Sequence, residues 1–455
     1  MKISRIVAGV LAVALLFAAC GSGSKGTVAP KSAPTTLGGP RQSTTLGVGV
    51  TPTSIKLGVS LIDFSCIEAY TNSVRFGQPA VYQAFINYVN QHGGIDGRKI
   101  VPVYKMFCPI GTATILAACT SLTEDSNVFA VIGTFYDPSG DAQTCVAGQH
   151  HRVLLTFDLT QAIMNKAPAG LEINAGSNPE RLVRVLLELL GKRGTLKGRT
   201  VAVLGDTTLA STVNGTILPG LKKLGVKVAD TGFLTVGGSA DTTAAQAQLE
   251  SFIERWKTEH VDTVFLSSYE VSSIQFVEKL RQEMPNLLLL SDNGEVLGYE
   301  QQLEHEGMKP NPYEGLITAG GPTSEEYAVS ANWKYCRTIY HQETGKVAPG
   351  PNDVVPYKGS KTTTLDTYGS INDACQLVTM FHDIGTRVGK YLNDTNWINT
   401  VNTFGPIVNR GTGPYSSLSK GKYDADDDWR LEELDSSLPP DGNWKAMTPI
   451  QNITG

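Results

Sequence analysis

The chain has 455 residues, with 38 basic and 43 acidic side chains and a formal net charge of −5. This weakly acidic balance, without a basic patch, excludes nucleic acid as a partner. No phosphate loop, His-Glu-x-x-His or Gly-x-Ser-x-Gly motif occurs, so the sequence indicates no cofactor and no enzyme of these classes.

The N-terminus is typical of an export signal. Two basic residues precede a short apolar run that ends in LLFAAC at Cys20, too short to form a stable membrane span. An apolar signal that ends on cysteine resembles a bacterial lipobox, although Phe17 stands where that pattern prefers leucine. We therefore predict a lipoprotein signal peptide at residues 1–20 and lipidation of Cys20. The alternative is plain secretion after cleavage near Ala19.

Residues 21–53 have a different composition. They are mainly glycine, serine, threonine and proline, and no acidic residue occurs before Asp63. Such a stretch buries too little apolar surface to fold, so we expect a disordered tether. About 400 residues follow, enough for two domains and a sizeable core, and none of their apolar runs is long enough for a membrane span.

Short apolar runs then alternate with amphipathic stretches, which indicates an α/β domain with a parallel sheet. The expected strands are at 55–61, 100–104, 128–133 and 153–155, and the expected helices at 79–92, 111–124 and 143–150.

The pattern restarts near residue 175. Asn178-Pro179-Glu180 has the composition of a helix start, with an N-cap and a proline in the first turn, and Gly191 is expected to end that helix. Further strands are expected at 201–204, 226–229, 261–266 and 287–290, with helices at 216–224, 243–259 and 273–283. Two similar β/α series in one chain predict two α/β lobes.

Cysteine usage indicates an oxidising compartment. Apart from Cys20, six cysteines remain, an even number that suggests up to three disulfides in an exported protein. They are Cys66, Cys108, Cys119, Cys145, Cys336 and Cys375. A metal site is the competing interpretation, but there is no Cys-x-x-Cys and no histidine pair at ligand spacing, so no metal is expected. The acidic run at 424–428 resembles a calcium loop only in part, and we expect a solvated turn there.

Six short stretches together carry a resemblance to a known family. They are IKLGV at 55–59, NYVNQHGGI at 87–95, DGRKI at 96–100, AVIG at 130–133, VDTVF at 261–265 and DNG at 292–294. In order and spacing, from about residue 54 to residue 435, the chain resembles the type I periplasmic solute-binding proteins of ABC importers, in particular the branched-chain amino acid-binding (leucine/isoleucine/valine-binding) family.

The resemblance implies a fold and a set of domains. Two doubly wound parallel-sheet lobes would be joined by three hinge strands, near residues 174, 318 and 407. Lobe I would comprise residues 54–174 and 319–407, and lobe II residues 175–318 and 408–445.

The resemblance also implies a function. The protein would capture a small polar solute, an amino acid or a related amide or acid, in the cleft between the lobes by hinge closure, and pass it to ABC permease subunits. It would be a monomer without a cofactor, lipid-anchored on the outer face of the bacterial cytoplasmic membrane. The alternatives are a ligand-sensing receptor subunit of the same fold and, from a different class, a secreted hydrolase. The hydrolase is disfavoured because no catalytic set of nucleophile, base and orienting residue can be identified in the sequence.

On the family's topology, all six cysteines outside the signal fall in lobe I. Cys66 and Cys108 follow neighbouring strands, Cys119 and Cys145 lie on adjacent helices, and Cys336 and Cys375 lie on consecutive helices. These are the expected pairs, and Cys108–Cys145 is the rival pairing.

Ligands of open α/β sheets bind at the carboxyl ends of the strands, and the resemblance places candidates there. In the loop after residue 133 these are Tyr136, Asp137 and Ser139, where relatives hold a ligand carboxylate. Asp137 would repel a carboxylate, and its alternative role is to cap a turn or a helix.

The other loops supply six more candidates. Asp158 and Thr160 follow the strand at 153–155. From lobe II, Tyr269 would close over the ligand, and Asp292, Asn293 and Glu295 fall where relatives carry an acidic residue for a ligand amine.

Overall fold

The computed structural model describes residues 42–454 except 69–70, 72, 136, 138, 158, 237–241, 306, 352, 354, 360–362 and 440–441. Of the residues singled out above, Cys20, Tyr136 and Asp158 lie outside the described residues, and so does the side chain of Glu295. No helix in the described part of the chain combines the length and the apolar character that crossing a bilayer requires.

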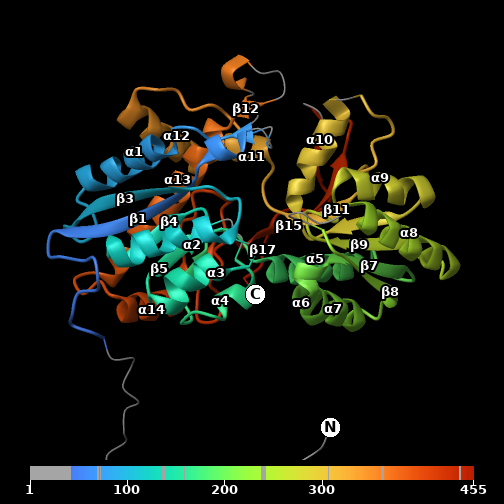
Figure 1. Ribbon diagram of the computed structural model, residues 1–455, viewed down its shortest axis with the longest axis horizontal. Helices are drawn as coiled ribbons and strands as arrows, with labels where there is room; N and C mark the ends of the chain where they lie inside the picture. The colour runs from blue at the N-terminus through green and yellow to red at the C-terminus, as the bar shows by residue number, and fades with distance from the viewer. Residues whose placement is uncertain are drawn as a thin grey trace, which may run out of the picture. The chain divides into compact units, whose positions relative to one another are not determined.

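The first sheet is parallel, in the order β3-β1-β4-β5-β6. Its strands are β1 (Ser54–Ile62), β3 (Lys99–Phe107), β4 (Ala130–Gly133), β5 (Val153–Thr156) and β6 (Glu172–Asn174). Helices α1 (Gln78–Gln91), α12 (Ala331–Thr344) and α13 (Thr367–Val388) cover one face; α2 (Thr112–Thr120), α3 (Asp141–Gln143) and α4 (Gln161–Met164) lie on the other (Figure 1). Wider, π-type turns continue α2 to Asp125 and α3 to Gln149.

The second sheet has the order β16-β15-β11-β10-β9-β7-β8. It is parallel from β8 to β11, and β15 and β16 add two antiparallel strands. Its strands are β7 (Thr200–Asp206), β8 (Lys227–Leu234), β9 (Thr263–Ser267), β10 (Leu288–Ser291), β11 (Ile317–Gly320), β15 (Asp428–Asp435) and β16 (Asn443–Ala446).

Helices cover both faces of this sheet as well (Figure 1). On one face lie α5 (Pro179–Arg193), α6 (Ala210–Thr212) and α7 (Leu218–Lys223); on the other lie α8 (Thr242–Thr258), α9 (Ile274–Glu283) and α10 (Leu297–His305). The remaining elements are α11 (Ser324–Ala328), α14 (Asp394–Asn402), the strand pairs β2–β12 (Ser73–Val74, Thr364–Leu365) and β13–β14 (Gly405–Pro406, Ser417–Leu418), and β17 (Gln451–Asn452) beside β15.

The chain passes between the two sheets three times. It leaves the first sheet after β6, returns after β11, and enters the second sheet again at β15. The segment that precedes β15 stays with the first core as far as Ala425, because Leu418, Tyr423 and Ala425 pack in the cluster built on the first sheet. The first and last passages pair with each other: Asn174 N–H donates to Tyr423 O, and Ala425 N–H donates to Asn174 O, both at 2.9 Å.

Two local expectations need correction. The helix that Asn178 caps does not end at Gly191. It continues to Arg193, and Gly194 adopts the left-handed conformation that ends it. Residues 42–53, expected within the tether, pack against the first core: Asn396 exchanges two hydrogen bonds with the backbone of Ser43, at 2.8 and 2.9 Å, and Val50 is buried.

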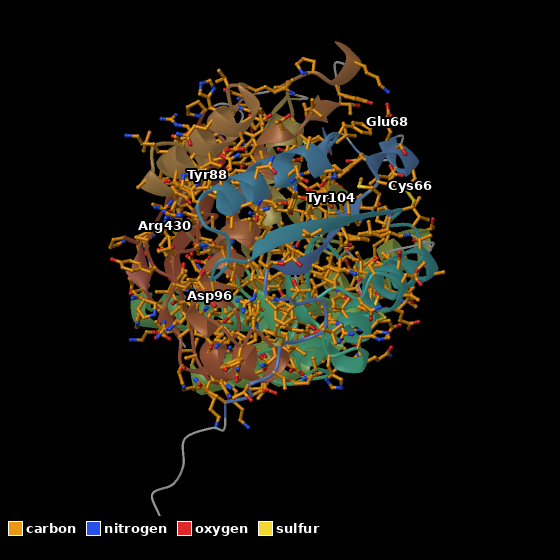
Figure 2. The ribbon with its side chains drawn as sticks, turned by 90° about the vertical axis from the view of Figure 1, so that its left-hand side faces the viewer. Cys66, Glu68, Tyr88, Asp96, Tyr104 and Arg430 are labelled. Atoms are coloured by element: carbon orange, nitrogen blue, oxygen red, sulfur yellow. A yellow bond between two sulfur atoms is a disulfide. The ribbon has the colours of Figure 1, made fainter. Side chains whose placement is uncertain are left out.

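Three disulfides connect the expected pairs. They are Cys66–Cys108, Cys119–Cys145 and Cys336–Cys375. Cys66, labelled in Figure 2, follows β1, and Cys108 follows β3, so the first disulfide joins the loops at the carboxyl ends of two neighbouring strands.

Candidate ligand-binding site

The loop after β4 is shaped by a glycine and an aspartate. A Cβ on Gly133 would lie 2.1 Å from Ser60 O, and its φ is +114°, so only glycine fits where the two strands end. Asp137 is buried, and its carboxylate accepts hydrogen bonds from Ser139 N–H (3.2 Å), Ser139 Oγ (2.7 Å) and Ala142 N–H (2.8 Å). Asp137 therefore caps the turn, which was the alternative to its expected contact with the ligand.

The loop after β5 brings in a residue that sequence reasoning missed. Thr160 caps α4 by accepting from Ile163 N–H at 3.2 Å. The next amide, Gln161 N–H, donates to Glu180 Oε2 at 3.0 Å, and Thr212 Oγ1 donates to Glu180 Oε1 at 3.1 Å. Glu180 lies in the first turn of α5 and is buried. Its carboxylate therefore links a loop of the first sheet to a helix of the second.

In the second sheet, Asp292 lies just after the carboxyl end of β10. Its carboxylate accepts from Ser267 Oγ at 2.6 Å and from Ser268 N–H at 3.1 Å. Burial raises the pKa of Asp292 to about 6, and the nearby charge of Glu180 adds to the increase. The backbone N–H of Asn293, beside it, donates a hydrogen bond to Ser291 Oγ at 3.1 Å.

Tyr269 follows β9 and stands in an aromatic row. Its ring stacks on Tyr299 with centroids 4.5 Å apart, and Tyr299 lies 6.1 Å from Tyr313, whose O–H donates to Ser272 O at 2.6 Å. The preceding residue, Ser268, has φ +131°, an uncommon value for a residue other than glycine. Tyr269 as a whole is half-buried.

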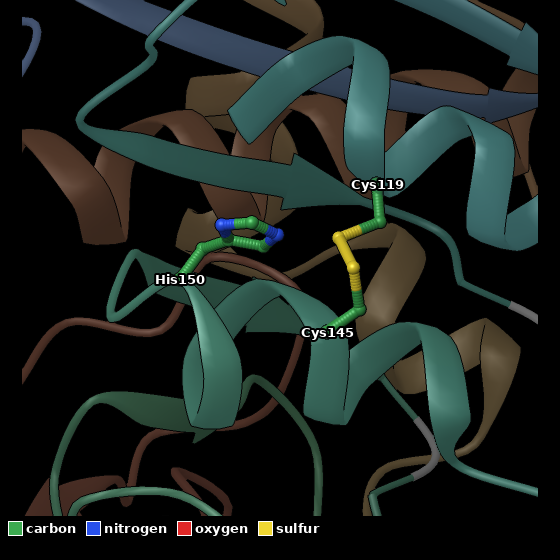
Figure 3. Close-up of side chains that lie close together, drawn as sticks. All are labelled: Cys119, Cys145 and His150. Carbon is green, nitrogen blue, oxygen red and sulfur yellow. A yellow bond between two sulfur atoms is a disulfide. The ribbon is translucent and has the colours of Figure 1, made fainter. Parts of the chain in front are cut away.

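One group of residues has the composition of a metal site. The ligand atoms of Cys119, Cys145 and His150 lie within 4.8 Å of one another. The two sulfurs are bonded to each other, as Figure 3 shows, so neither is a thiolate that could bind a metal ion. His150 instead contacts Glu124, with an N–O distance of 3.2 Å.

The acidic run at 424–428 is not a solvated turn. Asp424, Asp427 and Asp428 are buried. Arg181 pairs with Asp424 and Asp427, and Lys422 pairs with Asp427 at 3.0 Å. The charges of Asp424 and Asp427 are therefore compensated inside the protein, at the third passage between the sheets.

A surface hollow of about 580 Å³ lies elsewhere. It is lined by Glu326, Arg430 and residues 446–450, and it includes none of the candidate ligand residues. Figure 2 labels Arg430, whose guanidinium is held by Glu326 and Glu432. We therefore place the candidate site at the strand ends rather than at this hollow.

A model of the periplasmic binding protein family matches residues 72–319. No curated protein is significantly similar to the chain in sequence.

Solved structures share the fold at low sequence identity. An ABC transporter substrate-binding protein from Desulfitobacterium hafniense, in complex with Leu, is 13% identical, with 87% of this chain and 100% of that one covered and a TM-score of 0.58. A solute-binding protein from Rhodopseudomonas palustris BisB5, in complex with 3,4-dihydroxybenzoic acid, is 13% identical (88% and 98% covered, TM-score 0.56). A fatty acid ABC transporter substrate-binding protein from Thermomonospora curvata is 14% identical (90% and 95% covered, TM-score 0.59).

Proposed function

We propose that this member of the periplasmic binding protein family captures a small polar solute between two lobes for an ABC importer. The chain belongs to that family because the family model spans more than half of the chain, and it has the type I fold of the family. Solved proteins of the same fold include ABC transporter substrate-binding proteins. On this proposal the protein binds and releases its solute without chemical change.

One observation carries the proposal. The loops that follow β4, β5, β9 and β10 contain Asp137, Thr160, Tyr269 and Asp292, all at carboxyl ends of parallel strands, where ligands of open α/β sheets bind. Glu180, on α5 of the second sheet, accepts hydrogen bonds from Gln161 in the first-sheet loop after β5 and from Thr212 on α6 of the second sheet. Solute bound at these strand ends would contact both lobes, and rotation about the three passages would enclose it.

The finer parts of the proposal follow from the N-terminus and the chain order. Lipidation of Cys20 would hold the protein on the outer face of the cytoplasmic membrane, as a monomer next to ABC permease subunits. Lobe I would comprise residues 54–174 and 319–407, and lobe II residues 175–318 and 408–445; the packing of Leu418, Tyr423 and Ala425 in the first core favours a later start for the last segment of lobe II.

A binding screen tests the proposal. We expect at least one compound among amino acids, amides, amines, aromatic acids and sugars to raise the melting temperature and to bind in calorimetry. A ligand at 100 times its dissociation constant adds about 2.7 kcal/mol of stability. The Tyr269→Ala variant should bind that compound more weakly. Absence of any stabilising compound across all these classes would contradict a solute-binding role.

A further inference from the structure

We propose that the solute is an organic amine without a carboxylate group, because three loops at the strand ends already hold carboxylates of the protein itself. The three are Asp137, Glu180 and Asp292, each at least nine-tenths buried. This inference rests on the proposed function, and it goes further by naming the chemical class of the solute.

The first step concerns the loop after β4. Backbone amides and a hydroxyl that converge at a loop of this kind are donors for an anion. Here three of the described donors point at the chain's own carboxylate: Ser139 N–H, Ser139 Oγ and Ala142 N–H bond to Asp137. A carboxylate on a solute would have to displace Asp137 or lie beside its charge.

The loop after β5 follows the same arrangement. Its amides donate to protein oxygens, Ile163 N–H to Thr160 Oγ1 and Gln161 N–H to Glu180 Oε2. Glu180 comes from α5, a helix that covers the second sheet. Its carboxylate supplies the anion that a solute would otherwise bring to Gln161 N–H.

In the second sheet, Ser267 Oγ and Ser268 N–H both donate to Asp292. Asp292 and Glu180 lie close enough for the charge of one to raise the pKa of the other. Two carboxylates that repel each other are stabilised by a cation placed between or beside them.

The charge balance of these residues indicates what is missing. In the described part of the chain, no lysine, arginine or histidine forms an ion pair with Asp137, Glu180 or Asp292. Buried carboxylates without a counter-charge are costly. An ammonium or amidinium group on the solute would offset that cost and supply hydrogen-bond donors to the remaining acceptor positions.

A second, independent observation points the same way. Gln143 is buried, and its Nε2 donates to Phe135 O at 3.1 Å and Asp137 O at 3.4 Å. Its Oε1 has no hydrogen-bond partner among the described residues. The amide therefore lies against the backbone of Asp137 and offers a buried acceptor, which a donor on the solute would satisfy and a carboxylate would not.

Matched solutes test the charge requirement on the unmodified protein. Each set contains an amine, the amino acid that adds a carboxylate to it, and the acid that lacks the amine: 3-methylbutylamine, leucine and 4-methylpentanoate, for example, or agmatine with arginine. We expect the amines to bind at least about tenfold more tightly than the amino acids, since a like charge at this edge costs more than 1.4 kcal/mol. N-acetylated amines, which are neutral, should lose at least as much affinity.

Variants locate the effect. Glu180→Gln and Asp137→Asn keep the shape of the side chain and remove its charge, and each should weaken amine binding at least about tenfold and reduce the discrimination against the amino acid. Glu188→Gln is the matched control, because Glu188 lies on the same helix α5, is exposed and, among the described residues, forms its ion pair with Lys192. If either variant fails to fold, the comparison of solutes on the unmodified protein still decides.

The outcomes separate this inference from the proposed function. Equal or tighter binding of the carboxylate-bearing members, or binding of neutral sugars with no binding of amines, would overturn the amine inference and leave a solute-binding protein. Absence of binding by every class would overturn the proposed function, and the amine inference with it.

Discussion

Arg181 and Asp427 form a buried ion pair with an N–O distance of 2.5 Å, although they are far apart in the sequence. Arg181 also pairs with Asp424 at 3.3 Å and donates to the backbone oxygens of Asp426 and Ile453. One guanidinium thus connects the start of α5 to the last passage between the sheets and to Ile453, the residue that follows strand β17. These three segments are therefore held together by a single buried side chain.

We therefore expect Arg181→Ala to be strongly destabilising. Removing one partner of a buried ion pair leaves uncompensated charge, which typically costs about 3–5 kcal/mol of unfolding free energy. Chemical denaturation followed by circular dichroism measures this change. The control is Arg184→Ala on the same helix, where the side chain is exposed and substitution should cost less than about 0.5 kcal/mol. Similar losses in both variants would argue against the special role of Arg181.

Stability should decrease as pH rises from about 5 to 8.5. Burial raises the pKa of Glu172 and of Glu300 to about 8, and that of Asp426 to about 7. Each raised pKa means that the folded protein keeps a proton that the unfolded chain releases above its ordinary pKa, near 4.5 for glutamate. Unfolding then releases protons, so stability falls as pH rises through this window and levels off above the folded pKa.

Thermal melts at pH 5.5, 7.0 and 8.5 check this expectation. Glu300→Gln should have a shallower pH dependence and a higher melting temperature at pH 8.5, because neither oxygen of Glu300 has a hydrogen-bond partner among the described residues and the nearby charges of Glu314, Glu304 and Asp435 are all negative. Glu188→Gln should follow the parent. A melting temperature that rises steadily towards pH 8.5 would contradict the assignment.

The mature protein should contain no free thiol apart from any at Cys20. Mass spectrometry without reduction should assign Cys336 to Cys375, and replacing both with alanine should lower the unfolding free energy by about 3–4 kcal/mol, because the disulfide closes a loop of 39 residues. Alkylation of several cysteines in the folded protein would refute the pairing. The control is Cys20→Ser, which removes a cysteine and leaves the three disulfides intact; its unfolding free energy should match that of the parent.

The sequence predicted what depends on local pattern. Alternating apolar runs located the strands, and the doubly wound topology that the family resemblance implies brought Cys66 near Cys108. The capping role of Asp137 was the alternative to its expected contact with the ligand, because an aspartate before a proline commonly bonds to amides a few residues later. These features involve residues that are close in sequence or related by a regular topology.

The features that were missed depend on distant partners. Glu180 resembles an ordinary acidic residue in the first turn of a helix, and only the folded chain brings Gln161 and Thr212 to its carboxylate. The end of the tether has a polar composition typical of disorder, yet the side chain of Asn396 pairs with the backbone of Ser43. No local sequence pattern predicts such partners, because each residue of these pairs, taken alone, is compatible with a solvent-exposed position.

Lipidation of Cys20 predicts a clear change in location. In the parent protein the lipid should keep the chain in the membrane fraction, and Cys20→Ser should release it to the soluble fraction or leave an uncleaved precursor. Cell fractionation followed by immunoblotting measures this. The double substitution of Cys336 and Cys375, away from the signal, should remain membrane-bound. Equal membrane association of Cys20→Ser and the parent would show that the anchor is not at this cysteine.

Tyr269 and Thr160 should differ in what their substitution affects. Thr160 caps α4, so Thr160→Ala should lower the unfolding free energy of the empty protein by about 1 kcal/mol.

Tyr269 is half-buried, and its ring stacks on Tyr299. Losing a contact that is buried only when solute is enclosed costs about 1–3 kcal/mol, or ten- to a hundredfold in affinity. We expect Tyr269→Ala to show this loss in calorimetry while the empty protein keeps most of its stability. Tyr269→Phe, which retains the stacked ring, separates the ring from the hydroxyl: near-parental affinity would assign the contact to the ring. Parental affinity in Tyr269→Ala itself would mean that the solute does not reach the end of β9, and the candidate site would have to be sought at other strand ends.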